Sequence, residues 1–524
     1  MVKNWTLLMN LFKGRASHAL AGAASLAFAT GLMGGVSHAA TASVTAIPTV
    51  TAIPSGGAYG HAANAIAYAT VPFNPGNFGY LEQEYKVSGT ANVYGYATTS
   101  PSNDSVTVLR SGPYVSRMII RGPANPAKFS GNVIVELFND AFAGDQSTAF
   151  PQAEAHIIRN GDVWVGITST ATGIADLKAF NPTRYASLSW ANPDASRNAT
   201  SCPVAPTSTV EDGFVYDIVS QTAAFLRSTA PSNPLNGYKV KAIYAAGYSG
   251  SAESLLTYVR AIEPTLATAP FDGYMITAGA ARAPLNECSP ASEETSHNLV
   301  PASTRAAVMQ VQTPSEVAVY LAANKTAFPH QADSDAATNR YRFYEIAGSS
   351  HVDQTLVNGA PNLTDQKAIF GTTINTITAG CKQAGKVSTF PDLYVYDNLW
   401  AKLEGWVTAG TAPPHATEIT GVDKLGNVAG GVRSPAVDVP TAIYVPGSVS
   451  PLYSVVGAVT LPCPFLGYEV DLNLAQLTAV YGNKPTYVNY VSYDASNLYA
   501  QGFLELADAQ AIIAAAEAAP LPTH

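Results

Sequence analysis

The stretch AIYAAGYSGSAESLLTYV, which runs from Ala242 to Val259, decides how this chain folds. Its first part is an unbroken run of small and apolar residues, which is typical of a strand buried on both faces. Its last part opens a helix over Ser251–Ile262, because apolar residues recur there at helical spacing until Pro264 ends the pattern. The stretch therefore predicts a strand, a tight turn and a helix, with the pentapeptide GYSGS, residues 247–251, in the turn.

A serine in such a turn is a candidate nucleophile. The turn exposes the hydroxyl and aims the next backbone N–H at a developing oxyanion, provided that small residues stand two places before and after the serine. Gly247 and Ser251 fill these places, so we predict that Ser249 is the nucleophile and Gly250 an oxyanion donor. Ser251 is a weaker candidate, because a bulky glutamate would then stand two places after the serine. A purely structural Ser- and Gly-rich turn is the alternative.

A hydroxyl also needs a base and an acid that orients the base, and in this kind of fold they follow the serine in the order acid, then histidine. His351 ends the apolar run RYRFYEIAGSSH, which would deliver its imidazole to a strand end. Glu316 follows the strand-like AAVMQVQ and could hold that imidazole, with Asp353 as the alternative acid. The other histidines after Ser249 lack such a strand: His297, His330, His415 and His524.

The second oxyanion donor is expected in the loop after NVIVELF, where we predict the backbone N–H of Asn139. No cluster of side chains has the sequence spacing of metal ligands, and GNVAGGV does not follow a strand as a phosphate-binding loop would. The sequence therefore predicts no metal and no cofactor.

Around the turn, apolar strand-like runs alternate with helical stretches. This alternation predicts an α/β fold in which helices cover both faces of a mostly parallel central sheet. Further helices are expected at Asp212–Arg227 and Leu393–Val407. The expected strands are Tyr85–Tyr94, Val115–Arg121, Asn132–Phe138, Val163–Thr168, Val240–Ala245, Phe271–Ile276, Ala306–Gln312 and Tyr341–Ile346.

We expect one domain over residues 40–524, with a catalytic core at about 80–412. Two loop-rich segments, 171–206 and 280–305, leave the ends of predicted strands and would form a cap, because α/β sheets bind ligands beyond the carboxyl ends of their strands. A C-terminal extension, 413–524, has Gly- and Pro-rich turns and a final alanine-rich helix, and is expected to pack on the same core.

The N-terminus predicts export. A basic segment, an apolar run over Ala19–Val36 and the sequence Ser-His-Ala form a secretory signal, residues 1–39, with an uncleaved membrane anchor as the less favoured alternative. Removing it changes the formal charge from −9 to −12, which disfavours nucleic acid and anionic membranes as partners. A small-molecule or polymeric ester substrate fits better. The oligomeric state stays open.

The chain has four cysteines, and an even number in an exported protein favours two disulfides, with three possible pairings and four unpaired thiols as the alternative. They are spaced too widely for a Cys-x-x-Cys zinc or redox motif. The candidates are Cys202, Cys288, Cys381 and Cys463.

The chain resembles the bacterial proteins known as alpha/beta hydrolase domain proteins, most of them exported. The resemblance rests on ordered matches along nearly the whole mature chain, among them PAKFSGNVIVELFN, YDIVSQTAAFLR, GYSGSAESLLTYVRAIEP, VMQVQTPSEV, FYEIAGSSHVD and GNVAGGVRSPAVDVPTA. It implies an alpha/beta-hydrolase fold and places Ser249, Glu316 and His351 where the family's triad lies. Two features differ from the usual pattern: the nucleophile elbow has Gly250 in place of a glutamine and Ser251 in place of the usual glycine, and Pro314 replaces the first of two acids.

Together these observations predict an exported serine hydrolase that cleaves carboxylic esters through an acyl-enzyme and needs no cofactor. Two other classes stay open on the sequence alone. One is a catalytically weak or inactive binding protein of the same fold, since the elbow is altered. The other is an acyltransferase that uses the same triad.

Overall fold

The computed structural model describes residues 46–54, 56–57, 74–97, 104–140, 144–194, 196–279, 281–289, 300–301, 304–324, 328–359, 367, 371–381, 385–447, 453–456 and 459–521. The predicted signal 1–39 lies outside these residues, as do His297, His524 and most of the second predicted cap segment beyond residue 289.

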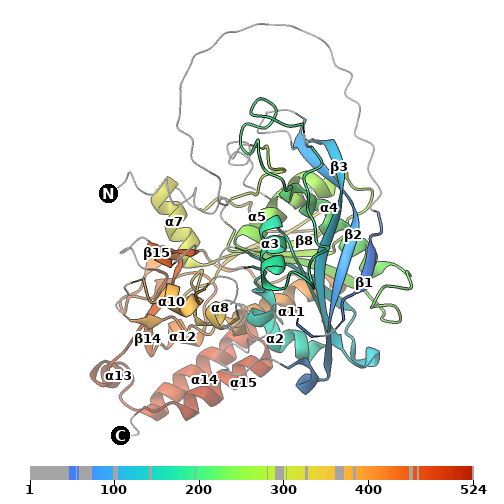
Figure 1. Ribbon diagram of the computed structural model, residues 1–524. Helices are drawn as coiled ribbons and strands as arrows, with labels where there is room; N and C mark the ends of the chain where they lie inside the picture. The colour runs from blue at the N-terminus through green and yellow to red at the C-terminus, as the bar shows by residue number, and fades with distance from the viewer. Residues whose placement is uncertain are drawn as a thin grey trace.

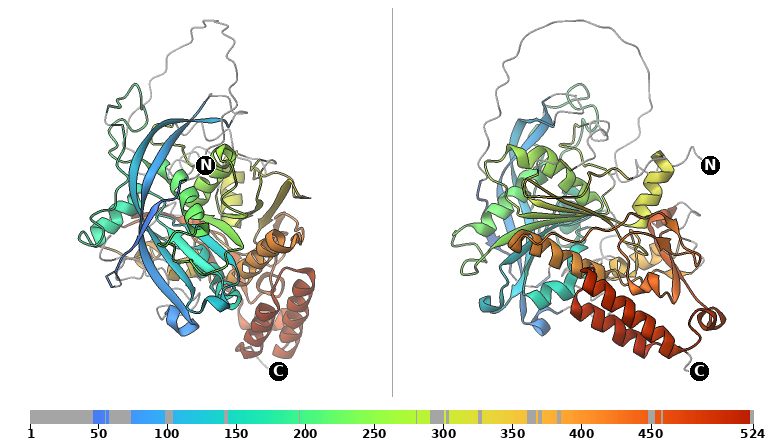
Figure 2. Two further views of the ribbon diagram at one scale, coloured as in Figure 1. Left: turned by 90° about the vertical axis from the view of Figure 1, so that its right-hand side faces the viewer. Right: turned by 180° about the vertical axis from the view of Figure 1, so that it is seen from behind.

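A ten-stranded sheet runs through the middle of the molecule in the order β1-β2-β3-β5-β4-β6-β7-β8-β10-β9 (Figures 1 and 2). The strands from β5 through β4, β6, β7 and β8 to β10 are parallel, whereas β1, β2, β3 and β9 add antiparallel edges. The bounds are β1 (Thr49–Ala52), β2 (Tyr80–Tyr96), β3 (Val106–Pro123), β4 (Asn132–Leu137), β5 (Val163–Ile167), β6 (Ala242–Tyr248), β7 (Gly273–Thr277), β8 (Ala307–Gln312), β9 (Ser334–Ala336) and β10 (Asn339–Glu345).

All eight expected strands are present, and the central ones are buried at every residue, as their continuous Val, Ile and Ala runs require. Their ends differ by a few residues from the expectation. The largest difference is in β2 and β3, which form a longer hairpin than their apolar residues indicate. The hydrogen-bonded pairing of the two strands continues into partly exposed ends. The predicted α/β class is confirmed.

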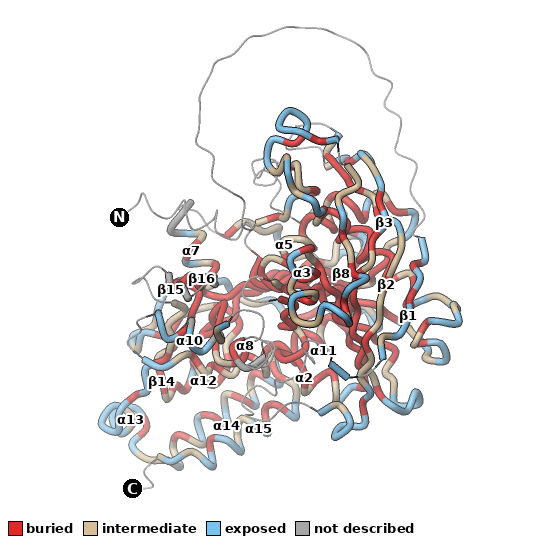
Figure 3. Tube along the Cα trace, in the orientation of Figure 1, coloured by how far each residue is buried: buried red, intermediate tan, exposed pale blue. Residues whose placement is uncertain are grey.

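Helices cover both faces of the sheet and build two separate cores. One core joins α3 (Ala171–Phe180), α4 (Val215–Arg227) and α5 (Gly250–Thr257) to one face. The other joins α2 (Ala149–Asn160) and α11 (Leu393–Ala409) to the opposite face, through side chains such as Trp164, Trp400 and Leu403. Figure 3 shows the resulting buried interior around the strands.

The chain after β10 forms smaller elements beside the sheet. A three-stranded sheet of β11, β17 and β14 and two short hairpins stand there with short helices. The strands are β11 (Lys386–Val387), β12 (Gly421–Val422), β13 (Val428–Ala429), β14 (Ala442–Val445), β15 (Tyr453–Val456), β16 (Val459–Pro462) and β17 (Tyr468–Asp471). The helices after β10 are α8 (Gln354–Gly359), α10 (Ile374–Thr378), α12 (Pro435–Asp438), α13 (Leu474–Tyr481), α14 (Lys484–Gln501) and α15 (Leu506–Ala518), whereas α7 (Pro314–Asn324) lies between β8 and β9.

The last two helices, α14 and α15, pack as an antiparallel hairpin at the lower edge of the molecule in Figure 1. The hairpin is tied to the core by a hydrogen bond from Asn398 Nδ2 on α11 to the Gly502 carbonyl, at 3.0 Å. It is also tied by an ion pair between Arg159 Nη1 on α2 and Asp508 Oδ1, at 3.0 Å. Within the described residues, none of the helices combines the length and the apolar character that a bilayer crossing demands.

Both disulfides form, with the pairing Cys202–Cys288 and Cys381–Cys463. The first joins the two segments predicted as a cap. The second joins the region after α10 to a turn at Cys463–Phe465 in the C-terminal extension. The cross-links therefore connect irregular segments to one another rather than parts of the sheet.

Candidate active site

Ser249 sits at the carboxyl end of β6, in the turn that leads directly into α5. Its φ of 55° and ψ of −124° are strained for a residue with a side chain, and among the described residues only Ala278 also combines a side chain with a positive φ. The turn is held by the Ser249 N–H, which donates to the Thr277 carbonyl at 2.9 Å. Strain of this kind costs about 1–3 kcal/mol and gathers at functional sites, which favours a function for Ser249.

The small residues around Ser249 are required by the geometry of the turn. A Cβ on Gly247 would lie 2.7 Å from the Ser251 carbonyl oxygen and 2.8 Å from Ala252 N, so only glycine fits there. The Ser251 hydroxyl accepts a hydrogen bond from Tyr248 N at 2.9 Å and lies 3.0 Å from the Tyr248 carbonyl oxygen, to which it donates. Serine in the place usually taken by glycine therefore fastens the turn instead of opening it.

Gly250, the residue after Ser249, faces open space. A Cβ built on it meets no atom within 4 Å, so a larger side chain would also fit at this position. Its N–H lies in the first turn of α5, where backbone N–H groups have no partner within the helix. Its role as an oxyanion donor stays a prediction.

His351 lies after β10 in a loop that packs against the turn of Ser249. Its backbone carbonyl accepts a hydrogen bond from the Tyr248 hydroxyl at 2.8 Å, and its ring centroid lies 5.4 Å from that of Tyr248. Phe465 from the C-terminal extension packs edge-on against the other side of the ring, at 4.8 Å. Since Tyr248 directly precedes Ser249, these contacts join the loop of His351 to the turn of Ser249.

Glu316 contacts His351 directly, because one of its carboxylate oxygens, Oε1, pairs with the ring nitrogen Nδ1 of the histidine. Both side chains are buried, with 1% of Glu316 and 3% of His351 exposed. The other carboxylate oxygen, Oε2, accepts hydrogen bonds from the N–H and the hydroxyl of Thr313, at 2.7 and 2.6 Å. The carboxylate is therefore fixed on one side by Thr313 and presented to the imidazole on the other.

The start of α7 explains how Glu316 is held. Thr313 precedes the helix, Pro314 is its first residue, and Ser315 N donates to the Thr313 hydroxyl at 3.2 Å. This reciprocal bonding is similar to a capping box, in which a threonine and a glutamate three residues later cap a helix together. Proline is favoured at the first helical position, so Pro314 strengthens this start.

Asp353, the alternative acid, bonds elsewhere. Its Oδ1 accepts a hydrogen bond from Leu356 N, in the first turn of α8, at 2.9 Å. Burial raises the pKa of Asp353 to about 6, and the charge of Asp353 adds to burial in raising the pKa of Asp392 at the start of α11. The two carboxyls thus form a buried pair behind the histidine loop.

The two other described histidines after Ser249 make unrelated contacts. His330 stacks on Phe343 and pairs with Glu418 at 3.3 Å. His415 is exposed and pairs with Asp333 at 2.8 Å. Neither contact involves the turn of Ser249.

Asn139 supports the turn through its side chain. Its Nδ2 donates to the Tyr248 carbonyl at 2.7 Å, while its backbone N–H donates to the Gln146 carbonyl at 3.0 Å. In this arrangement the N–H predicted as the second oxyanion donor already has a protein acceptor.

Sequence reasoning missed four residues that organise the site: Tyr248, Thr313, Ser315 and Phe465. The hydroxyl of Ser315 accepts from His351 N at 3.0 Å and donates to the Pro446 carbonyl at 2.7 Å. Only Thr313 had a local signal, the sequence Thr-Pro-Ser-Glu, which matches a capping box. The others contact His351 from distant parts of the chain. Residues able to hold a metal lie near the amino end of β5 and are treated below.

Comparison with known proteins shows what the chain is similar to. The model of a family described as "Alpha/beta hydrolase domain" matches residues 47–514. No curated protein matches the chain.

Similar solved structures include esterase Est22, at 9% identity, covering 55% of this chain and 78% of that one with a TM-score of 0.28. A thermophilic esterase of Thermogutta terrifontis has 14% identity, with 44% and 77% covered and a TM-score of 0.24. A fungal esterase of Rhizomucor miehei has 11% identity, with 52% and 77% covered and a TM-score of 0.27. At these scores the similarity carries no argument about the chemistry of this chain.

Proposed function

Since this chain belongs to the alpha/beta hydrolase domain family, we propose that it is an exported serine hydrolase that cleaves carboxylic esters through an acyl-enzyme on Ser249. The observation that carries the proposal is the contact between Glu316 and His351, next to a serine with strained backbone angles. A structural turn would need neither the strain nor the buried acid and base beside it.

In the proposed reaction Ser249 Oγ attacks the ester carbonyl while His351 takes its proton through Nε2. Glu316 keeps the other ring nitrogen, Nδ1, protonated and stabilises the imidazolium that forms. The histidine then returns the proton to the leaving alcohol. Water, activated by the same histidine, hydrolyses the acyl-enzyme and restores the serine.

The negative charge on the carbonyl oxygen is assigned to backbone donors. The Gly250 N–H, in the first turn of α5, is the proposed first donor, and donors of this type contribute roughly 10²–10³ in rate each. For Asn139 to serve as the second donor, its N–H must exchange the Gln146 carbonyl for the substrate oxygen. The Asn139 side chain already holds the residue before the nucleophile and keeps the turn in place.

The substrate would enter over the carboxyl ends of the parallel strands. The segments 171–206 and 280–305 are the proposed cap, and the Cys202–Cys288 disulfide supports their acting as one unit. Phe465 against His351 supports a contribution of the C-terminal extension to the pocket wall. The two disulfides are compatible with an exported protein.

The test compares the wild type with Ser249→Ala on p-nitrophenyl esters of increasing acyl chain length. Loss of the nucleophile should lower kcat at least roughly a thousandfold, because serine hydrolases depend on it for almost all of their chemistry. A fluorophosphonate probe should label the wild type at Ser249 and leave the variant unlabelled. Ser496→Ala, which changes an exposed serine on α14, is the control and should keep wild-type activity and labelling.

Equal activity of Ser249→Ala and wild type would refute the mechanism. Labelling of Ser249 without hydrolysis of any ester would support an activated serine but contradict the proposed specificity for esters. If added alcohols collect the acyl group in preference to water, the protein is an acyltransferase instead.

A further inference from the structure

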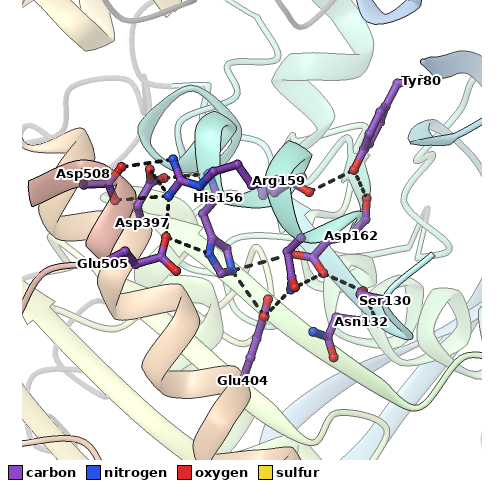
Figure 4. Close-up of polar contacts among 12 residues, drawn as sticks. Tyr80, Ser130, Asn132, His156, Arg159, Asp162, Asp397, Glu404, Glu505 and Asp508 are labelled. Carbon is purple, nitrogen blue, oxygen red and sulfur yellow. Dashed lines mark hydrogen bonds and ion pairs between the residues drawn. The ribbon is translucent and has the colours of Figure 1, made fainter. Parts of the chain in front are cut away.

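A buried cluster of ionisable side chains lies at the amino end of β5 (Figure 4). His156 comes from the last turns of α2, Asp162 from the residue before β5, and Glu404 from α11. His156 Nε2 lies 3.2 Å from Glu404 Oε2 and 3.7 Å from Asp162 Oδ2. One nitrogen and two carboxylate oxygens, all within 4.8 Å of one another, thus converge on one point.

The cluster has more acceptors than donors. Asp162 Oδ2 and Glu404 Oε1 are buried without a hydrogen-bond partner among the described residues. Asp162 is fully buried, and Glu404 and His156 are 5% and 4% exposed. Leaving buried carboxylate oxygens unpaired is costly unless a cation or a proton satisfies them.

The ligand atoms are held in place by neighbouring residues. Asp162 Oδ1 accepts from the Ser130 hydroxyl at 2.6 Å and from Asn160 Nδ2 at 2.8 Å, which leaves Oδ2 to face His156. Asn160 Nδ2 also donates to Glu404 Oε2 at 2.8 Å. The other ring nitrogen of His156, Nδ1, lies 3.3 Å from Glu505 Oε2. A carboxylate on the far nitrogen is how proteins orient a histidine that ligates a metal.

The charges of the surrounding network do not balance. Figure 4 shows five carboxylates, Asp162, Asp397, Glu404, Glu505 and Asp508, around Arg159 and His156. The site therefore favours an added positive charge.

We propose that His156, Asp162 and Glu404 bind a divalent metal ion, with Zn²⁺ as the best fit. Zinc takes imidazole nitrogen and carboxylate oxygen at about 2.0–2.2 Å, so ligand atoms around it stand roughly 3–3.5 Å apart, near the two separations observed. Calcium and magnesium prefer oxygen-only sites. Binding displaces any proton held by His156 Nε2 and Asp162, and a water completes the coordination.

The position of the site makes the metal structural. Its ligands lie at the amino ends of the parallel strands, whereas Ser249 lies at a carboxyl end. The ion joins the α2–β5 connection to α11, and through Glu505, the residue before α15, it also fastens the C-terminal hairpin of α14 and α15. The inference does not depend on the proposed ester hydrolysis.

The experiment measures the metal content of the full exported chain, purified without chelators and without a histidine tag, by inductively coupled plasma mass spectrometry. The wild type should hold about one Zn²⁺ per chain. Removing zinc with dipicolinate should lower the Tm, and adding Zn²⁺ should restore it. Glu404→Gln and Asp162→Asn should each lose most of the metal and no longer respond to the chelator.

Asp508→Asn is the matched control, because Asp508 pairs with Arg159 in the same network but is not a ligand; it should keep its zinc.

Should the ligand variants fail to fold, wild-type protein reconstituted with Co²⁺ gives an independent readout. Visible absorption bands typical of a nitrogen- and oxygen-ligated ion would support the site. The proposal would be overturned if the Tm of metal-free wild type did not change when Zn²⁺ or Mn²⁺ is added. It would also be overturned if both ligand variants retained zinc. If the Tm does not respond to metal, a protonated His156 holds the carboxylates of Asp162 and Glu404 instead.

Discussion

At the scale of single residues, the backbone of Ser249 is the most informative feature. A side chain at φ 55° is tolerated only where the surroundings enforce it, and here Gly247, the Ser251 hydroxyl and the Thr277 carbonyl do so. The packing of the buried strand β6 and of helix α5 on either side of Ser249 offsets the free energy of that strain. The proposed nucleophile is therefore held in a defined backbone conformation.

The role of the acid can be tested by two matched amide substitutions. Glu316→Gln removes the charge that contacts His351 and should lower kcat roughly 10²–10⁴-fold, because the imidazole loses its orientation and the stabilisation of its cation. Asp353→Asn should keep near wild-type kcat, since its carboxyl bonds Leu356 N instead. Steady-state kinetics on one p-nitrophenyl ester, with melting curves for both variants, measures the difference. A larger loss in Asp353→Asn would reverse the assignment.

At the scale of elements, the carboxyl pair Asp353 and Asp392 couples the histidine loop to α11. The pKa of Asp353 is raised to about 6, so the folded protein keeps a proton that the unfolded chain releases above about pH 4. Stability from this pair is complete below the unfolded pKa and is lost as the pH rises through about 6.

Asp353→Asn should remove that pH dependence, because the amide has the shape of the protonated acid. We expect its Tm relative to wild type to increase from pH 5 to pH 8. Asp471→Asn, at an exposed position, is the control and should follow the wild type at each pH. Parallel Tm curves for wild type and Asp353→Asn over this range would show that Asp353 titrates normally.

At the scale of the whole molecule, the C-terminal extension completes the site instead of standing apart from it. Phe465 packs on His351, and the Pro446 carbonyl accepts from Ser315, which in turn supports His351 N. The Cys381–Cys463 disulfide fastens the turn that carries Phe465.

The two disulfides should therefore have different effects when removed. Losing a native disulfide commonly costs about 2–5 kcal/mol, so both double serine variants should melt earlier. Cys381→Ser with Cys463→Ser should also lower kcat, because Phe465 is released from His351, the proposed base. Cys202→Ser with Cys288→Ser should instead alter KM across substrates of different size, since it frees the proposed cap. Identical kinetic changes in the two variants would argue against separate roles.

The sequence by itself determined the α/β class, the central strands and the turn of Ser249, because these depend on local apolar patterns and on small residues at fixed spacing. It also indicated Glu316 and His351, each at the end of a recognisable strand; their catalytic roles stay predictions. Gly247 and the capping signal at Thr313 belong to the same local information.

Only the tertiary structure decided which cysteines pair, which groups surround His351, and that the Asn139 N–H already has an acceptor. It also brought together His156, Asp162 and Glu404, although the sequence predicted no metal. The residues His156 and Glu404 are 248 positions apart, and no sequence spacing can reveal a site whose ligands meet only when α2 and α11 pack on the same face of the sheet. Such contacts follow from the packing of distant elements, and local patterns do not encode them.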